Sequence, residues 1–271
     1  MAVIHRGNEK LKEDLKQLGR VRVMVLLGAL AAAAVCALLI VYAIPWLKDL
    51  LSAAAGTVLF KVLQTVHYIC IGGLVLSVLC IIGSFGRREA EDRERGILKA
   101  GIEGEEKALR IMEHLPGSYH VYTNLIVPYN GKESETDMIV AGPTGVYIVE
   151  VKGHKGTITG DWSDENLRQE KDDRSRTVKT FYNPLKQVGT HVYRLSNAFR
   201  QQKISCGWIE GCVLFADDEA CLNVTDKAGR QPHVYTYGTR VQLRDFITLN
   251  TANSVSHEQL NRIIAYLNSL L

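Results

Sequence analysis

Two long stretches without a charged residue lie in the amino-terminal third of the chain. One runs from Val23 to Leu47 and the other from Val62 to Gly86, and each has 25 residues. A helix that crosses a bilayer needs about 20 apolar residues, whereas a core helix of a soluble protein usually keeps one polar face. The pattern predicts two transmembrane helices, at about 23–46 and 63–85. Two buried core helices are the alternative.

Lysine and arginine flank these two stretches unevenly. Six occur in residues 1–22, two in the turn between the stretches and five in residues 87–100. Cytoplasmic flanks carry the excess of positive charge, so we expect a multi-pass protein of the cell membrane with both termini in the cytoplasm and the lipid bilayer as a partner. His67 lies just inside the second stretch, where an interfacial position is favoured over a proton relay.

These features divide the chain into four parts. They are a basic amino-terminal segment (1–22), a transmembrane hairpin (23–86), a charged helical linker (87–100) and a domain (101–271). Residues 1–86 carry a net charge of +4 and residues 87–271 a net charge of −1, which excludes a uniformly basic nucleic-acid-binding domain. The six cysteines lack metal-site spacing, so a zinc ribbon and a disulfide scaffold are also excluded.

Residues 99–115 have the apolar spacing of an amphipathic helix. The apolar side chains that share one face are Ile102, Ala108, Leu109, Met112 and Leu115. Glu105 falls near the centre of this face, where a carboxylate needs a cationic partner or a metal ion. A solvated position in the first helical turn, where acids suit the helix dipole, is the alternative. The pattern alone leaves both readings open.

A strand–turn–strand pattern follows at residues 136–152. The strands are expected at 136–141 and 146–152, around the turn Gly142-Pro-Thr-Gly145. If Ala141 pairs with Val146, Asp137 lies across from Glu150, and Lys152 shares their face. Opposite carboxylates about 5 Å apart repel each other unless a cation separates them. That cation is either a divalent metal ion or the Lys152 ammonium, and the spacing does not choose between them.

Further elements are expected downstream of this hairpin. Apolar runs predict strands at 209–216 and 233–237, and an amphipathic pattern predicts a closing helix at 256–271. Asn183-Pro184 has the form of a helix start, with an N-cap residue followed by proline at the first helical position. The acidic run at 217–219 is interpreted as a surface loop.

Six sequence pieces, in order, resemble the nuclease-related domain (NERD) family of the PD-(D/E)XK nuclease superfamily. They are Gly101-x-x-Gly104-Glu105, Thr136-Asp137-Met-Ile-Val, Gly145-Val-Tyr-Ile-Val-Glu150-Val-Lys152-Gly153, Gly156-x-Ile-x-Gly160, Trp162, and Asn183-Pro184-Leu185-Lys-Gln187. The chain departs from the family pattern in having Met138 after the first acid. The resemblance implies an α/β fold: a mixed β-sheet flanked by helices, following the hairpin.

The resemblance also implies roles for individual residues. Asp137 and Glu150 would bind Mg²⁺ or Mn²⁺, and Glu105 would complete the metal shell or hold its water. Lys152 would orient the attacking water and offset charge on the phosphate, and Gln187 would hydrogen-bond the water or a phosphate. A metal that activates water and offsets negative charge is what phosphodiester hydrolysis requires.

A basic run between Arg174 and Lys203 contains seven cations and no acid. A track of cations can contact phosphates without reading sequence, and the alternative is a solvated helix face. The residues expected to bind nucleic acid are Arg174, Arg176, Lys179, Lys186 and Arg194. His191 follows Gln187 by one helical turn, and we interpret it as a supporting residue rather than a catalyst.

The leading functional hypothesis is a membrane-anchored, cytoplasm-facing, metal-dependent nuclease, with DNA favoured over RNA as its partner. One alternative is a catalytically idle module that binds nucleic acid or a phosphoprotein. Another is a membrane-bound interaction partner in a stress or defence complex. The intact acids and lysine favour the nuclease. The sequence does not decide whether the protein forms a homo-oligomer or binds other membrane proteins. It also does not decide between endonuclease and exonuclease action.

Overall fold

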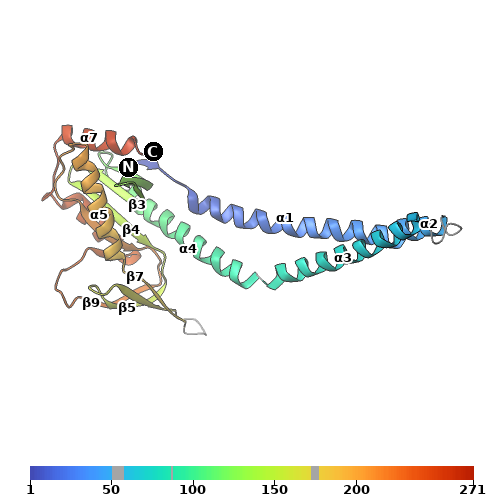
Figure 1. The fold of residues 1–271 in the computed structure, drawn as a ribbon. Coiled ribbons are helices and arrows are strands. Elements are labelled where there is room, and N and C mark those ends of the chain that lie inside the picture. The colour runs from blue at the N-terminus through green and yellow to red at the C-terminus, as the bar shows by residue number, and fades with distance from the viewer. Residues whose placement is uncertain (51–57, 87, 172–176) are drawn as a thin grey trace. The chain divides into compact units, whose positions relative to one another are not determined.

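The computed structural model describes residues 1–50, 58–86, 88–171 and 177–271 (Figure 1). The chain divides into two compact units. One comprises Lys12–Leu98, and the other combines Met1–Leu11 with Lys99–Leu271.

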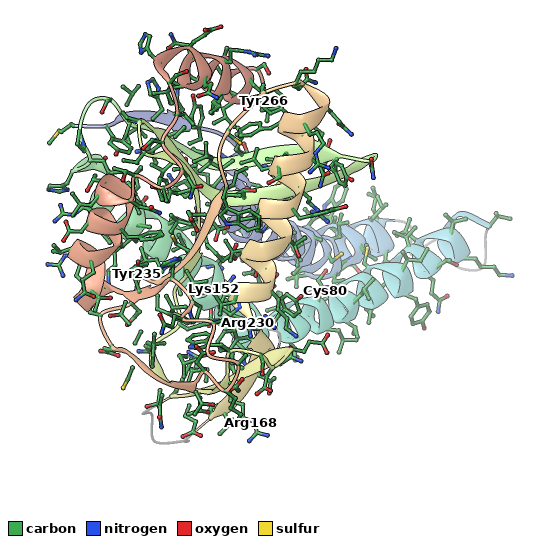
Figure 2. All side chains as sticks on the ribbon, turned by 90° about the vertical axis from the view of Figure 1, so that its left-hand side faces the viewer. Cys80, Lys152, Arg168, Arg230, Tyr235 and Tyr266 are labelled. Carbon is green, nitrogen blue, oxygen red and sulfur yellow. The ribbon has the colours of Figure 1, made fainter. Side chains whose placement is uncertain are left out.

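The Lys12–Leu98 unit is built from apolar helices. These are α1 (Lys10–Leu38), a π-helical segment (Leu39–Ala43), α2 (Ile44–Leu50) and α3 (Val58–Gly86). Two spans, Lys12–Leu50 and Lys61–Gly83, are long and apolar enough to cross a membrane. The most apolar 18-residue stretch of the first span has no buried share. In the second span, 11% of the corresponding stretch is buried. These apolar stretches are therefore largely exposed in the described structure; Cys80, for example, is exposed on α3 (Figure 2).

The larger unit contains a six-stranded sheet with the order β1-β2-β3-β4-β8-β10. Its strands are β1 (Val3–Arg6), β2 (His120–Tyr129), β3 (Lys132–Gly142), β4 (Gly145–Lys152), β8 (Glu210–Phe215) and β10 (Val234–Thr236). The β2–β3 and β3–β4 pairs are antiparallel, and the β1–β2, β4–β8 and β8–β10 pairs are parallel. The sheet is therefore mixed, as predicted.

Helices cover both faces of this sheet. On one face, α5 (Pro184–Gln201) and α7 (His257–Asn268) pack against strand residues such as Ile148. On the other, α4 (Arg88–Glu113) and α6 (Arg240–Leu249) pack against residues such as Tyr147. A one-turn 3-10 helix, Tyr237–Thr239, precedes α6. Alternate residues of β4 enter separate cores, which explains why both faces of this strand are apolar. The predicted α/β fold class is confirmed.

A smaller, four-stranded sheet has the order β7-β6-β5-β9 and was not predicted from the sequence. It comprises β5 (Gly156–Asp161), β6 (Asn166–Glu170), β7 (Val178–Tyr182) and β9 (Ala220–Thr225). Gly156 has φ +83°, and a Cβ there would lie 2.3 Å from the carbonyl oxygen of Glu170. Only glycine suits this position, which explains the glycine that opens the Gly156-x-Ile-x-Gly160 piece.

The amino-terminal residues form an unexpected edge strand. In β1, Val3 pairs with His120 and Arg6 with Thr123 of β2. The contact continues beyond the strand, because the Asn8 N–H donates to the carbonyl of Asn124 at 3.0 Å. A segment that precedes the two apolar spans is thus part of the sheet formed by residues that follow them.

Candidate active site

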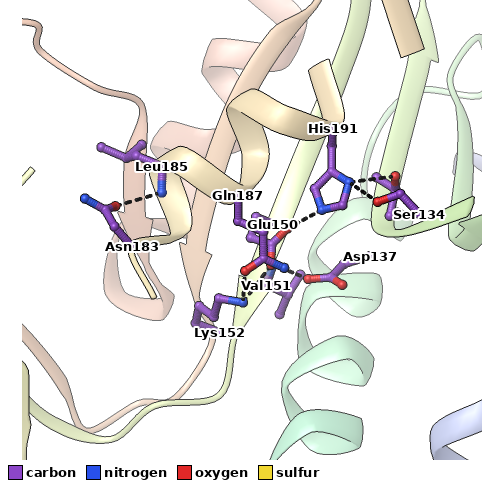
Figure 3. A network of polar contacts seen from close by, with 10 residues as sticks. Ser134, Asp137, Glu150, Val151, Lys152, Asn183, Leu185, Gln187 and His191 are labelled. Atoms are coloured by element: carbon purple, nitrogen blue, oxygen red, sulfur yellow. Dashed lines mark hydrogen bonds and ion pairs between the residues drawn. The ribbon is translucent and has the colours of Figure 1, made fainter. Parts of the chain in front are cut away.

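The β3–β4 hairpin sets the geometry of the site. Ala141 pairs with Val146 and Met138 with Val149, and Gly142 and Gly145 close the turn. The register predicted from the sequence is therefore confirmed over these pairs. It brings Asp137 and Glu150 together just beyond the last of these pairs, with Lys152 two residues after Glu150 on β4 (Figure 3).

Glu150 lies completely buried between two basic side chains. The Lys152 Nζ is 2.6 Å from its Oε1, and the His191 Nε2 is 3.4 Å from its Oε2 (Figure 3). Burial by itself would raise the pKa of Glu150, but the contacts with His191 and Lys152 outweigh it, so the pKa is lowered. Glu150 therefore remains ionised at neutral pH.

Asp137 experiences the opposite balance. The backbone N–H of Val151 donates to its Oδ2 at 2.8 Å. Burial, followed by the negative charge of Glu150, raises the pKa of Asp137 to about 8, against the opposing effects of the Val151 hydrogen bond and of Lys152. Two neighbouring carboxyl groups with pKa values pushed apart share a single negative charge at neutral pH. A divalent cation would displace the proton from Asp137.

Lys152 is also held by the helix that covers the site. Its Nζ donates to Oε1 of Gln187 at 3.0 Å. Gln187 is positioned because α5 begins at Asn183, whose side chain accepts a hydrogen bond from the Leu185 N–H at 3.0 Å, with Pro184 at the first helical position. The predicted helix start is confirmed. The Asn183 Nδ2 also donates to the carbonyl of Trp162 at 3.0 Å, which connects two of the recognised sequence pieces.

Glu105 approaches from the opposite side of the sheet. It is half-buried on α4, and its Oε2 accepts a hydrogen bond from the Nδ2 of Asn124 at 3.0 Å. Its charge further raises the pKa of Asp137. Gly153 permits this approach, since a Cβ there would lie 2.4 Å from the carbonyl oxygen of Ala100. The glycine that follows Lys152 is thus required by the packing of α4 on the end of β4.

His191 contributes more to the site than its sequence position indicated. It is buried on α5, one turn after Gln187, and its Nδ1 lies 3.2 Å from the Ser134 hydroxyl and 3.4 Å from that of Thr136. When either hydroxyl donates to Nδ1, the neutral ring carries its hydrogen on Nε2 and presents it to Glu150. The spacing of His191 from Gln187 was the signal for this role, but the contact with Glu150 required the fold.

The predicted nucleic-acid-binding residues are distributed over several elements. Arg174 and Arg176 lie outside the described residues. Lys186 is exposed and Arg194 partly exposed on α5, and Lys179 is on β7. Burial, together with the charges of Lys152, Lys171 and Lys179, lowers the pKa of His154 to about 4. Lys179 therefore contributes to a positive environment near Lys152, with Lys171 as a further cation that the sequence reasoning missed.

Residues 100–216 match the family model described as "Nuclease-related domain". This part of the chain is therefore similar to nuclease-related domains. No curated protein and no solved structure matches the chain significantly. Residues 100–216 include the β3–β4 hairpin, α5 and β8. Helices α6 and α7 follow this region and complete the two cores.

PD-(D/E)XK-type nuclease domains commonly use divalent metal ions. Among the described residues, no three His, Cys, Asp or Glu side chains are grouped to hold one metal ion. In the described structure Glu105 is therefore not grouped with the other two acids, and its place in the metal shell stays a prediction. Asp137 and Glu150 still supply hard oxygen donors. Among the described residues, the buried Oε2 of Glu150 forms no hydrogen bond of good geometry, although the His191 Nε2 lies 3.4 Å away. This donor set fits a divalent cation that keeps several water ligands, as Mg²⁺ does.

Proposed function

We propose that this protein is a membrane-anchored, metal-dependent nuclease that hydrolyses phosphodiester bonds and whose nuclease-related domain faces the cytoplasm. One observation carries the proposal. Asp137, Glu150 and Lys152 meet at the end of the β3–β4 hairpin, with a positive charge 2.6 Å from a fully buried carboxylate. A buried cluster of charges inside a nuclease-related domain is typical of a catalytic centre rather than a structural core.

Asp137 and Glu150 would hold the divalent cation, which when bound supplies an activated water and offsets charge on the phosphate. Lys152 would donate a hydrogen bond to the phosphate or orient the water, since its ammonium is held in place by Glu150 and Gln187. The Gln187 Oε1 accepts from Lys152, so its Nε2 is the group able to donate to a water or phosphate oxygen. Mg²⁺ and Mn²⁺ both suit these ligands, and DNA is the favoured substrate.

His191 would keep Glu150 ionised and correctly oriented. Its imidazole lies against the carboxylate oxygen that Lys152 does not contact, and the hydroxyls of Ser134 and Thr136 support its far side. Groups that orient a metal ligand in this way commonly tune metal affinity. Glu105 would act from outside the metal's direct ligands, through a water or through its charge on Asp137.

Membrane anchoring is supported by the placement of β1. This strand precedes the first apolar span, yet it pairs with β2, which follows the second span. Pairing requires both flanks to lie on the same side of a bilayer, and two crossings satisfy that requirement. The excess of lysine and arginine in the two flanks over the connecting turn supports the cytoplasmic side.

A catalytically idle module that binds nucleic acid is the second candidate. It is favoured by the closure of the site, because Glu150 is fully buried and both of its oxygens face basic side chains of the protein itself. In that reading Lys152 is a structural bridge whose removal leaves two acids uncompensated. The two functions therefore predict different effects of metal on stability.

The test uses the full-length chain in detergent micelles with labelled DNA and RNA, each single- and double-stranded, in Mg²⁺, Mn²⁺ or EDTA. The nuclease proposal predicts cleavage in the divalent metals, none in EDTA, and its loss in Glu150→Gln. The matched control is Glu258→Gln, because Glu258 is exposed on α7 outside the site, and this variant should cleave as the wild type does. Absence of cleavage for every substrate and metal, with binding retained, would establish the idle module instead.

A further inference from the structure

A groove separate from the candidate active site lies along α5. Its volume is about 830 Å³, within the range of roughly 300–1,000 Å³ typical of ligand pockets. Val188, Val192 and Ser196 of α5 form one wall, and residues 204–211 and 230–233 form the rest. None of the proposed catalytic residues lines it. Gln187 and His191 face the carboxylates from one flank of α5, and the groove occupies another.

Two aromatic rings are exposed at the groove. The side chain of Trp208 is 69% exposed and that of Tyr193 is 60% exposed. The loop that carries Trp208 is fixed, because its backbone N–H donates to Oδ1 of Asn253 at 3.0 Å. An exposed indole on a loop whose backbone is held in place offers a platform for stacking. Bases of a single strand stack on such platforms, whereas the bases of a duplex already stack on each other.

Two guanidinium groups provide positive charge in the same groove. Arg200 is exposed, and its Nη1 donates to the neutral Asn197 Oδ1, at 3.3 Å. Arg230 comes from the facing loop, near the amino-terminal half of α5 (Figure 2). Neither forms an ion pair with a carboxylate of the described residues. The acid that lines the groove, Glu210, accepts a hydrogen bond from Asn253 at 2.8 Å. The charge of the groove thus suits a polyanion.

We propose that this groove binds a single-stranded segment of nucleic acid. A base would stack on Trp208, and phosphates would contact Arg200 and Arg230. The inference rests on the proposed function and deepens it, since it names unpaired nucleic acid as the class of substrate that the domain holds. An exposed aromatic ring combined with basic side chains is the pattern by which proteins hold single strands without reading their sequence.

The test is fluorescence anisotropy of the full-length chain in detergent micelles with a labelled 15-nucleotide oligo(dT), the corresponding oligo(U), and a duplex of the same length. EDTA is present throughout, so that binding is measured without cleavage. Both single strands should bind more tightly than the duplex. Trp208→Ala should weaken single-strand binding roughly tenfold, and Trp208→Phe should restore most of it, because a ring is retained.

Charge is tested with the double variant Arg200→Gln/Arg230→Gln. The slope of log Kd against the logarithm of the salt concentration should be smaller for this variant than for the wild type. The expected difference is about 1.4, or about 0.7 for each lost phosphate contact. Arg110→Gln is the matched control, because Arg110 is exposed on α4, across the sheet from the groove. It should leave the salt dependence unchanged. Melting temperatures equal to that of the wild type would verify that these exposed substitutions leave the fold intact.

The outcomes separate this inference from the proposed function. Cleavage in Mg²⁺ together with unchanged single-strand binding in Trp208→Ala would refute strand binding in the groove and leave the nuclease proposal standing. Binding that depends on Trp208 and the two arginines, without cleavage in any metal, would support strand binding in the groove and refute the proposed nuclease activity. Equal affinity for the duplex and the single strands would also overturn the inference.

Discussion

Asp137→Asn should stabilise the metal-free protein at alkaline pH, although it removes a proposed metal ligand. The folded protein raises the pKa of Asp137 from an ordinary value of 3.8 to about 8, through burial and the charge of Glu150. Its contribution to stability is therefore fully present below about pH 4 and is lost as the pH rises towards 8. Asparagine cannot ionise, yet its Oδ1 can still accept the hydrogen bond from Val151.

The size of the effect follows from the pKa shift. The difference between a pKa of 3.8 and one of about 8 sets a ceiling of roughly 6 kcal/mol on the change in the free energy of unfolding between pH 4 and pH 8. Water entry and local relaxation reduce the cost of a buried charge. We therefore expect Asp137→Asn to gain at least about 2 kcal/mol at pH 8 in EDTA. For a domain of this size that corresponds to about 4–8 °C in melting temperature.

The assay is thermal unfolding of the full-length wild type and Asp137→Asn in detergent, from pH 5 to pH 8.5, with EDTA or with Mg²⁺. The advantage of the variant should grow with pH in EDTA and shrink in Mg²⁺, because bound Mg²⁺ would stabilise the wild type by replacing the proton. Asp161→Asn is the control of opposite sign. Hydrogen bonds from Ser163, Thr225 and Lys227 lower the pKa of Asp161, so this variant should lose stability at pH 8.

A pH-independent difference between the wild type and Asp137→Asn would refute this reasoning. A variant less stable than the wild type at pH 8 in EDTA would refute it as well. Either result would mean that Asp137 is ionised in the metal-free fold, and that Lys152 rather than a metal ion compensates both acids.

Three further predictions concern the chemistry, the packing and the topology. Lys152→Met should abolish cleavage while calorimetric titration still detects Mn²⁺ binding, and loss of both would indicate a structural bridge. In a melting assay, Gly153→Ala should lower stability by about 1–3 kcal/mol, because its Cβ would lie 2.4 Å from the Ala100 carbonyl oxygen. The control Gly189→Ala has open space around it on α5 and should be neutral or stabilising in the same assay. Reporter fusions at either terminus should be active as cytoplasmic reporters, and a carboxy-terminal fusion that reports the outside would contradict the proposed topology.

Short-range patterns in the sequence were sufficient for the hairpin and the start of α5. A strand repeats every two residues, so a four-residue turn between Ala141 and Val146 determines which residues oppose each other throughout the ladder. An N-cap likewise depends on neighbours only, as at Asn183. The two apolar spans were equally visible, because their length and lack of charge are properties of composition.

Tertiary structure decided everything that joins residues distant in sequence. The contact of His191 with Glu150, the hydrogen bond from Asn124 to Glu105 and the pairing of β1 with β2 connect segments that no local pattern relates. The groove at Trp208 also exists only where α5 meets two loops. Periodicity determines which side of an element a residue occupies. Which element packs against that side depends on burial of apolar surface across the whole domain, and therefore on the complete fold.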